Sequence, residues 1–326
     1  MTSIGIYHGD EEWVLKGIGR DIGKALSSSG NFSIETTDQV FKGARLNTDF
    51  HVFVQQGQLN SNCKNNKQLV PSGAICLFTH LDVGNFRPDI LANCKAVIFN
   101  SSIQLSMAIA NGYIPSNAYL QPHAVDPSIH TILSDNDPGL LQVLGQLQAS
   151  GRKLTSHSAV GFCGRYWDKY TYTRRKNYEK VKAVASTLIS EGIPVIVLGP
   201  GWDDVFTKKN SLLSLVEAKY KYYPFVYNLM KIFVSLSVHE GGPLPVLESM
   251  CCGAYPIVTN TGFAFDVIKD RSHGTLVDAF QSPDFYSNII KKQFASDQLD
   301  VELIRRQASK FSFSKLASLI SRICQA

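Results

Sequence analysis

The stretch VSLSVHEGGPLPVLESMCCGAYPIVTNTGF, residues 234–263, indicates the fold because it joins a strand, a glycine loop, a helix and a second strand. This order is typical of a βαβ unit in a parallel sheet. The same alternation continues in both directions. Strands are expected at 3–7, 50–55, 74–79, 96–100, 159–164, 194–199, 231–236 and 255–259, and helices at 11–28, 174–190 and 243–252. The sequence therefore predicts an α/β protein.

The alternation is interrupted between residues 126 and 156, where DPS, SDNDPG and GRK concentrate turn-forming residues. We therefore expect two Rossmann-like domains, at 1–150 (with a linker from about 126) and 151–310. An apolar stripe predicts one further helix over 311–326, formed by Leu316, Leu319, Ile320 and Ile323. If the domains face each other, a central cleft lies at the carboxyl ends of both sheets, where open α/β sheets bind ligands.

Charge and composition restrict the partners. Residues 1–150 hold 9 Lys+Arg against 12 Asp+Glu, and residues 151–326 hold 23 against 15. The basic half would attract a phosphorylated ligand or an anionic membrane surface. Its cations lack the aromatic interleaving of a nucleic-acid surface, so no nucleic-acid partner is expected. Seven cysteines without a CxxC pair indicate free thiols and no zinc site.

The chain start shows no signal-peptide pattern, and no apolar run approaches the ~18 residues of a membrane span. These features predict a cytoplasmic protein with at most weak peripheral membrane contact.

Glu240 and Glu248 flank the loop Gly241-Gly242-Pro243 at the expected start of a helix. Exposed backbone amides and the helix dipole favour an anion such as a diphosphate there. Pro243 suits a first helical turn because its missing N–H would be unpaired in that position. One carboxylate precedes the loop and the other lies about a turn and a half into the helix, so both could reach one hydroxyl-rich molecule. The pattern predicts a site for a phosphorylated sugar or nucleotide.

The segment EGGPLPVLESMCCGAYPIVT, residues 240–259, resembles the E-x7-E signature EGxGLPxxEAMAxGxPVVxT of retaining family 4 glycosyltransferases. The resemblance implies the GT-B fold, with a C-terminal helix that crosses back to the N-terminal domain. It also implies transfer of a hexose-type sugar from a nucleoside-diphosphate sugar to a glycan, lipid-linked or other hydroxyl acceptor. No metal and no additional cofactor are implied.

Site residues follow from the same resemblance. Glu240 would contact hydroxyls of the transferred sugar, and Glu248 would hold the nucleotide ribose. The loop backbone would meet sugar and phosphate through Gly241, Gly242, Pro243 and Leu244. Arg165 and one lysine of FCGRYWDKYTYTRRKN, residues 162–177, would bind the diphosphate; Lys176 is favoured over Lys169. Gly199, in Gly199-Pro200-Gly201, resembles a glycine turn near the nucleotide, and Thr261-Gly262-Phe263 resembles a turn that lines the donor pocket.

Resemblance in the first half is thinner. His80 follows an apolar strand and resembles an acceptor-side histidine, a residue able to hydrogen-bond or exchange a proton near neutral pH. A structural loop histidine is the alternative. PHAVDP, residues 122–127, resembles a PNGVD segment and would place His123 at the cleft. The segment Asn100-Ser101-Ser102 could cap a helix or contact the acceptor.

Several alternatives remain open on sequence alone. Asp135-Asn136-Asp137 is formally a metal-binding DxD, but its place in the expected linker favours turn chemistry. Tyr222, Tyr223 and Tyr227 could stack on a base or pack a helix. An inverting transferase or a sugar-nucleotide epimerase would share the fold, and a non-enzymatic two-lobed sugar-binding protein would share the domain plan.

Overall fold

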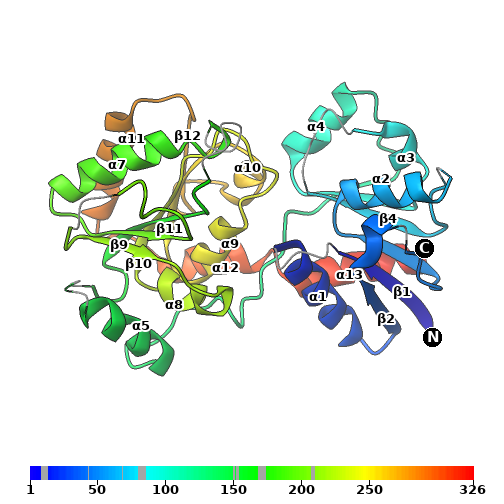
Figure 1. Cartoon of the computed structure of the whole chain (residues 1–326), viewed down its shortest axis with the longest axis horizontal. Helices are drawn as coiled ribbons and strands as arrows, with labels where there is room; N and C mark the ends of the chain where they lie inside the picture. Colours follow the sequence, from blue (N-terminus) through cyan, green and yellow to red (C-terminus); the bar gives the residue numbers. More distant parts are fainter. Residues whose placement is uncertain are drawn as a thin grey trace. The chain divides into compact units, whose positions relative to one another are not determined.

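The computed structural model describes residues 1–8, 14–42, 44–67, 69–79, 86–149, 151, 154–167, 174–206 and 210–326. The chain divides into two compact units. Unit 1 comprises Met1–Ala124 and Phe311–Ala326, and unit 2 comprises Val125–Lys310. Each unit contains a six-stranded parallel sheet with helices packed against it (Figure 1). The predicted α/β class with two Rossmann-like domains is confirmed.

The sheet of unit 1 has the strand order β2-β1-β3-β4-β5-β6. Its strands are β1 (Thr2–Tyr7), β2 (Phe32–Thr37), β3 (Phe50–Phe53), β4 (Ala74–Phe78), β5 (Ala96–Phe99) and β6 (Ala118–Leu120). Its helices are α1 (Val14–Ser27), η1 (Gln39–Lys42), α2 (Gln56–Asn65), α3 (Pro88–Ala92), α4 (Ser102–Ala110) and α13 (Phe313–Gln325).

Alternation along the strands of unit 1 produces two apolar layers. Ile4 and Ile6 of β1 point to a core with α1 and α13, which lie side by side in Figure 1. Tyr7 of the same strand points to the other core, which includes Leu59 of α2 and Leu91 of α3. Both faces of the sheet are therefore covered, as parallel sheets require.

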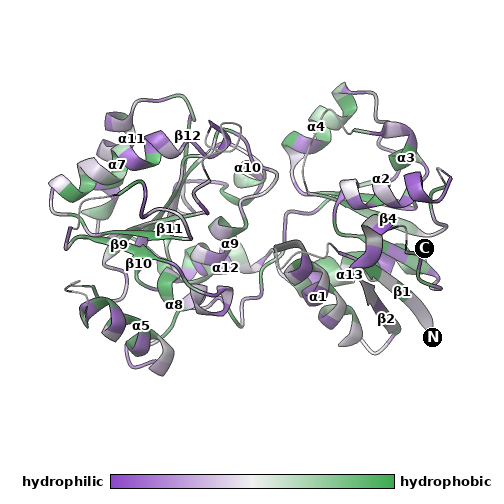
Figure 2. Ribbon diagram, viewed as in Figure 1, coloured by the Kyte–Doolittle hydropathy of each residue, from purple (hydrophilic) through white to green (hydrophobic). Residues whose placement is uncertain are grey.

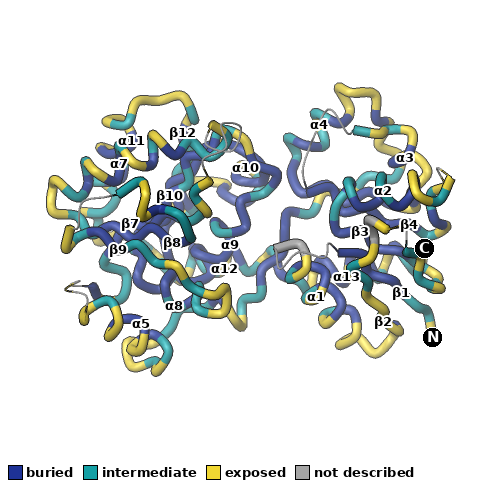
Figure 3. Tube along the Cα trace, viewed as in Figure 1, coloured by how far each residue is buried: buried dark blue, intermediate teal, exposed yellow. Residues whose placement is uncertain are grey.

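The sheet of unit 2 has the strand order β12-β11-β10-β7-β8-β9. Its strands are β7 (Ala159–Cys163), β8 (Val195–Leu198), β9 (Leu213–Val216), β10 (Met230–Ser235), β11 (Tyr255–Thr259) and β12 (Thr275–Val277). Its helices are α5 (Pro138–Ala149), α7 (Tyr178–Ser190), η3 (Tyr220–Tyr222), α8 (Tyr223–Tyr227), α9 (Leu244–Cys251), α10 (Ala264–Val267), α11 (Pro283–Phe294) and α12 (Val301–Ser309). The inner strands are apolar and buried (Figures 2 and 3).

Four strands were not predicted from the sequence, and all four are sheet edges. They are β2, β6, β9 and β12. Edge strands are short or half-polar, because one side of the ladder has no partner and at least part of one face meets solvent. β2 reads FSIETT with only Phe32 buried, and β6 has three residues, none of them buried.

The boundary between the units lies earlier than the expected residue 150. Residues 125–149 group with unit 2, because Asn228 accepts from the Leu133 amide (2.8 Å) and donates to the Thr131 carbonyl (2.9 Å). The expected linker also contains α5, which packs on α8; a Cβ on Gly139 would lie 2.3 Å from the Phe225 ring. Among the described residues, no helix has the length and apolar composition that a membrane crossing requires.

Candidate active site

Glu240 lies in the loop that follows β10, an inner strand of the second sheet. Its backbone N–H donates to Thr261 Oγ1 (3.0 Å), and its Oε1 accepts from Ser237 Oγ (2.8 Å). The turn after β11 supports the same loop, since Gly262 has a left-handed φ of 55° and a Cβ there would lie 3.1 Å from the Gly241 carbonyl. The carboxylate is thus held at the carboxyl edge of the sheet, where open α/β sheets bind ligands.

Lys176 is brought to Glu240 by hydrogen bonds between residues 175–177 and the loop after β10. The Val238 amide donates to the Arg175 carbonyl (2.8 Å), and the Asn177 side chain donates to the Leu236 carbonyl (3.1 Å). Between these anchors, Lys176 Nζ forms a hydrogen-bonded ion pair with Glu240 Oε1. The structure therefore joins two of the residues that the sequence analysis placed at the site.

The charge state of Glu240 follows from its surroundings. Burial raises the pKa of this carboxyl group, but the cation and hydrogen bond of Lys176, the charge of Arg175 and the Ser237 hydroxyl together hold it below its ordinary value. Glu240 is therefore a carboxylate at neutral pH. It can accept hydrogen bonds from hydroxyl groups, and a cation is already in place beside it.

Glu248 lies within α9 and is 2% exposed. Tyr227 donates to its Oε2 (2.9 Å), and Tyr220 donates to its Oε1. Burial, with the nearby Cys163 and Glu248, raises the pKa of Tyr227, so this phenol stays a hydrogen-bond donor. Tyr227 is fully buried, with its ring against Phe233, so for this tyrosine the packing interpretation holds.

The loop after β7 places Arg165 on the surface of unit 2. Its carbonyl accepts from the Tyr178 hydroxyl, and the preceding Gly164 carbonyl accepts from Trp202 Nε1 (2.7 Å). Gly199 is required by a close approach of two loops, since a Cβ on it would lie 2.5 Å from the Gly164 oxygen. Contact of Arg165 or Gly199 with a donor remains a prediction. Lys169 lies outside the described residues.

Leu244 is the first residue of α9, and Pro243 is its N-cap, one position earlier than the first turn expected from the sequence. Gly241, which is buried, and Gly242, which is half-buried, precede it. The two glutamates therefore stand on either side of a helix start, as the spacing predicts.

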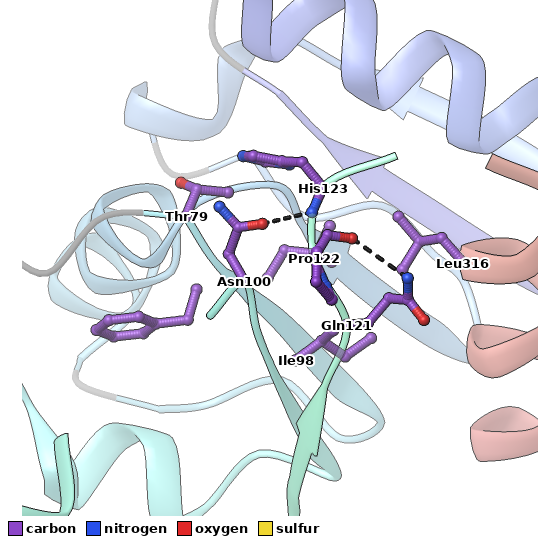
Figure 4. A pocket seen from close by; sticks show the side chains of 9 residues that line it. Thr79, Ile98, Asn100, Gln121, Pro122, His123 and Leu316 are labelled. Atoms are coloured by element: carbon purple, nitrogen blue, oxygen red, sulfur yellow. Dashed lines mark hydrogen bonds between the residues drawn. The ribbon is translucent and has the colours of Figure 1, made fainter. Parts of the chain in front are cut away.

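Unit 1 has a small pocket of about 10 Å³ at the carboxyl ends of β4 and β5, room for a single water molecule. Figure 4 shows Thr79, Asn100 and His123 gathered there, with the His123 amide donating to Asn100 Oδ1. Ser101 Oγ accepts from the Gln104 amide (3.1 Å) and caps α4, as the sequence suggested. His80, the expected acceptor-side histidine, lies outside the described residues.

A second pocket, of about 480 Å³, lies in unit 2 between α5 and residues 216–226. Tyr222, one of the tyrosines considered for base stacking, lines it, but Glu240, Glu248 and Lys176 do not. Within the described part of the chain, no group of three or more His, Cys, Asp or Glu side chains could hold a metal ion. Asp137 of the formal DxD instead accepts from the amides of Gly139 and Leu140 (2.9 Å each), at the start of α5.

Two partners of Glu248 were not foreseen from the sequence. His130 Nε2 lies 4.0 Å from Glu248 Oε1, and Tyr220 bonds to the same oxygen. Tyr220 belongs to the tyrosine-rich KYKYY segment, which was a usable signal. The isolated His130 offered none, because its proximity to Glu248 depends on how residues 125–133 fold onto unit 2.

Comparison with known proteins shows what part of the sequence and the whole fold are similar to. The family model described as "Glycosyl transferases group 1" matches residues 171–310, which include both glutamates and Lys176. None of the curated proteins matches the chain by sequence.

Solved structures resemble the chain over its whole length. Sucrose-phosphate synthase from Thermosynechococcus elongatus matches with a TM-score of 0.78 at 13% identity, covering 100% of this chain and 98% of that one. Anabaena HepE in complex with UDP-glucose matches at 0.66 and 14% identity, with coverage of 100% and 98%. The catalytic domain of Arabidopsis thaliana starch synthase IV, bound to ADP and acarbose, matches at 0.70 and 11% identity, with coverage of 100% and 99%. Residues 171–310 are therefore similar in sequence to group 1 glycosyl transferases, and the chain as a whole shares the GT-B fold of these solved structures.

Proposed function

We propose that this protein is a retaining, metal-independent glycosyltransferase that moves a hexose-type sugar from a nucleoside-diphosphate sugar to a hydroxyl of a glycan or lipid-linked acceptor. The observation that carries the proposal is the pair of buried glutamates, Glu240 and Glu248, on either side of one helix start. Both lie inside the segment that matches the family model.

The donor site is proposed from the chemistry of these side chains. Glu240 accepts hydrogen bonds from hydroxyls of the transferred sugar, and Glu248 accepts from the ribose. The amides of Gly241 and Gly242 at the start of α9 meet the diphosphate. Two structural relatives support a nucleotide in such a site, since HepE is described in complex with UDP-glucose and starch synthase IV as bound to ADP.

In the proposed reaction the bond between the anomeric carbon and the diphosphate oxygen breaks while the acceptor hydroxyl attacks from the same face. The acceptor's proton passes to the departing diphosphate oxygen. Lys176, Arg165 and the start of α9 stabilise the negative charge that develops there. Glu240 positions the sugar, because its Oε1 is already engaged by Lys176 and Ser237, which suits hydroxyl binding better than nucleophilic attack.

The acceptor is assigned to unit 1 on family resemblance, with His80 as a candidate contact. We also propose a cytoplasmic location, with at most weak contact to a membrane surface.

A nucleotide screen followed by product analysis tests the proposal. Thermal shift with UDP, ADP and GDP identifies the base, and the matching nucleotide sugars are then assayed for slow hydrolysis and for transfer to oligosaccharide acceptors. The expected product, analysed by proton NMR, keeps the anomeric configuration of the donor. An inverted product would contradict retention, and binding without turnover of any nucleotide sugar would favour a sugar-binding protein.

A further inference from the structure

Glu248 belongs to a side-chain cluster formed with His130, Tyr220 and Tyr227, here called the Glu248 cluster. Its members come from α9, from the segment before α5, from η3 and from α8, all within unit 2. Both carboxylate oxygens are engaged, Oε1 by Tyr220 and Oε2 by Tyr227. Each oxygen could accept a second hydrogen bond, but Glu248 is 2% exposed, so a ligand hydroxyl reaches its carboxylate by taking the place of one of these phenols.

Exposure distinguishes the two tyrosines. Tyr227 is 0% exposed, whereas Tyr220 is 47% exposed. Tyr227 can move only with the core of unit 2, since its ring also packs against Phe233. Tyr220 is therefore the member that an incoming ligand can displace, and its hydroxyl marks the position on Oε1 that a ligand hydroxyl would take.

His130 points to a ligand by a separate observation. It is 3% exposed, and neither of its ring nitrogens has a hydrogen-bond partner among the described residues. Its Nε2 lies 4.0 Å from Glu248 Oε1, and its ring centroid lies 5.9 Å from that of Tyr220. Buried polar atoms without partners are uncommon and unfavourable. The nitrogen of His130 that faces Glu248 therefore indicates a hydrogen-bonding group of a ligand.

We propose that the Tyr220 hydroxyl holds the place of a ribose hydroxyl on Glu248, and that its displacement lets the ribose diol bind between Glu248 and His130. A carboxylate only accepts hydrogen bonds, whereas a hydroxyl both donates and accepts. One hydroxyl of a vicinal diol can thus donate to Glu248 while the other pairs with His130. This inference rests on the proposed donor site, and it adds two residues to it.

Opposite effects of matched variants follow. Tyr220→Phe keeps the ring and removes the competing hydroxyl, so nucleoside-diphosphate affinity should rise about three- to tenfold. Tyr227→Phe removes a bond that positions Glu248, so affinity should fall by about the same factor. His130→Phe should weaken binding about tenfold and bring the affinities of the ribo and deoxyribo forms close together.

Isothermal titration calorimetry provides the test, with UDP or ADP, whichever binds the wild type, and its 2′-deoxy and 3′-deoxy forms. His273→Phe is the matched control, because His273 pairs with Asp270 elsewhere in unit 2. It should leave every affinity unchanged. If His130→Phe does not fold, the comparison between Tyr220→Phe and Tyr227→Phe still tests the inference. Tyr220 is half exposed, so its substitution should leave the fold intact.

Results that overturn the inference are distinct from those that overturn the donor site. If the wild type binds, and His130→Phe binds with the same affinity and the same preference for the ribo form over the deoxy forms, His130 does not belong to the site. Weaker binding in Tyr220→Phe would show that its hydroxyl supports the ligand and does not compete with it. Failure of the wild type to bind any nucleoside diphosphate would overturn the proposed donor site together with this inference.

Discussion

The ammonium of Lys176 and the carboxylate of Glu240 form an ion pair across 64 positions of sequence, within unit 2. The side chain of Glu240 is 6% exposed and that of Lys176 is 20% exposed. A cation and an anion at one loop suit a ligand that carries both phosphate and hydroxyl groups. The pair also makes stability depend on pH in a way that can be measured.

Lys176→Met should lower the free energy of unfolding by about 1–3 kcal/mol at pH 7, because Glu240 loses its partner while remaining buried. In the wild type the pKa of Glu240 is below its ordinary value of 4.5. Its contribution to stability is thus present above the unfolded-state pKa and is lost as pH falls through the folded-state pKa. In the variant the Lys176 cation that lowers the pKa of Glu240 is absent, so the pKa of Glu240 rises. Acid then protonates Glu240, which destabilises the folded variant as long as it is charged.

The difference in melting temperature between wild type and Lys176→Met should therefore be largest near pH 7 and shrink below the ordinary value of 4.5. Lys291→Met is the control, since Lys291 pairs with Glu191 at the surface and the pair should contribute less than about 1 kcal/mol. A difference that stays constant from pH 7 to pH 4 would argue against the ion pair.

Gly199→Ala should destabilise unit 2 by about 2–4 kcal/mol, because φ is 129° and a Cβ would lie 2.5 Å from the Gly164 oxygen. Gly192→Ala is a matched control with a positive φ of 83° but no atom within 4 Å of the added Cβ. It should cost only about 1–2 kcal/mol from backbone strain. Urea denaturation compares them, and equal losses would show that the loop contact is unimportant.

Transfer should continue in the presence of EDTA, because the phosphate charge is met by cations and a helix start. Asp137→Ala should lower stability by about 1 kcal/mol through the lost cap at α5 while leaving turnover unchanged. Coupled assays with and without EDTA and manganese make the measurement. Activity abolished by EDTA and restored by manganese, together with an inactive Asp137→Ala, would support a metal-binding DxD.

Membrane contact, if present, should be electrostatic, because the basic charge is concentrated in residues 151–326. Flotation with anionic vesicles should show binding at 0.1 M salt, where the screening length is about 10 Å, and none at 1 M, where it is about 3 Å. Neutral vesicles should show none at either salt. Salt-resistant binding to neutral vesicles would indicate an apolar anchor instead.

Much of the fold could be predicted because buried parallel strands are continuous apolar runs. The inner strands β1, β3, β4, β5, β7, β8, β10 and β11 all carried this signal. Edge strands such as β12 (TLV) are too short to show a period, and α5 was hidden by turn-forming residues on both sides. The domain boundary was displaced for the same reason, since the contacts of Asn228 with residues 131 and 133 have no local sequence pattern.

At the site, local residues were predicted better than distant ones. The loop and helix from Glu240 to Glu248 form one continuous segment, so spacing alone located both carboxylates. Lys176 required the fold, because its approach to Glu240 depends on backbone bonds between residues 175 and 238. His130 reaches Glu248 only through packing, which no local pattern reports, whereas for Tyr220 the tyrosine-rich KYKYY segment was the available signal.

The central claim is that Glu240 binds the transferred sugar and Glu248 binds the nucleotide. Calorimetric titration of the free nucleoside diphosphate, combined with steady-state kinetics, tests it in Glu240→Gln and Glu248→Gln. Glu179→Gln serves as a surface control on α7. Loss of a charge-assisted hydrogen bond of ~1.5–3 kcal/mol corresponds to a factor of roughly 10–150.

Glu248→Gln should lose that factor in affinity for the nucleotide and raise the donor KM, whereas Glu240→Gln should bind the nucleotide nearly as the wild type does and lose the factor in kcat. Nucleotide affinity that collapses in Glu240→Gln and is unchanged in a folded Glu248→Gln would contradict this assignment of the two glutamates.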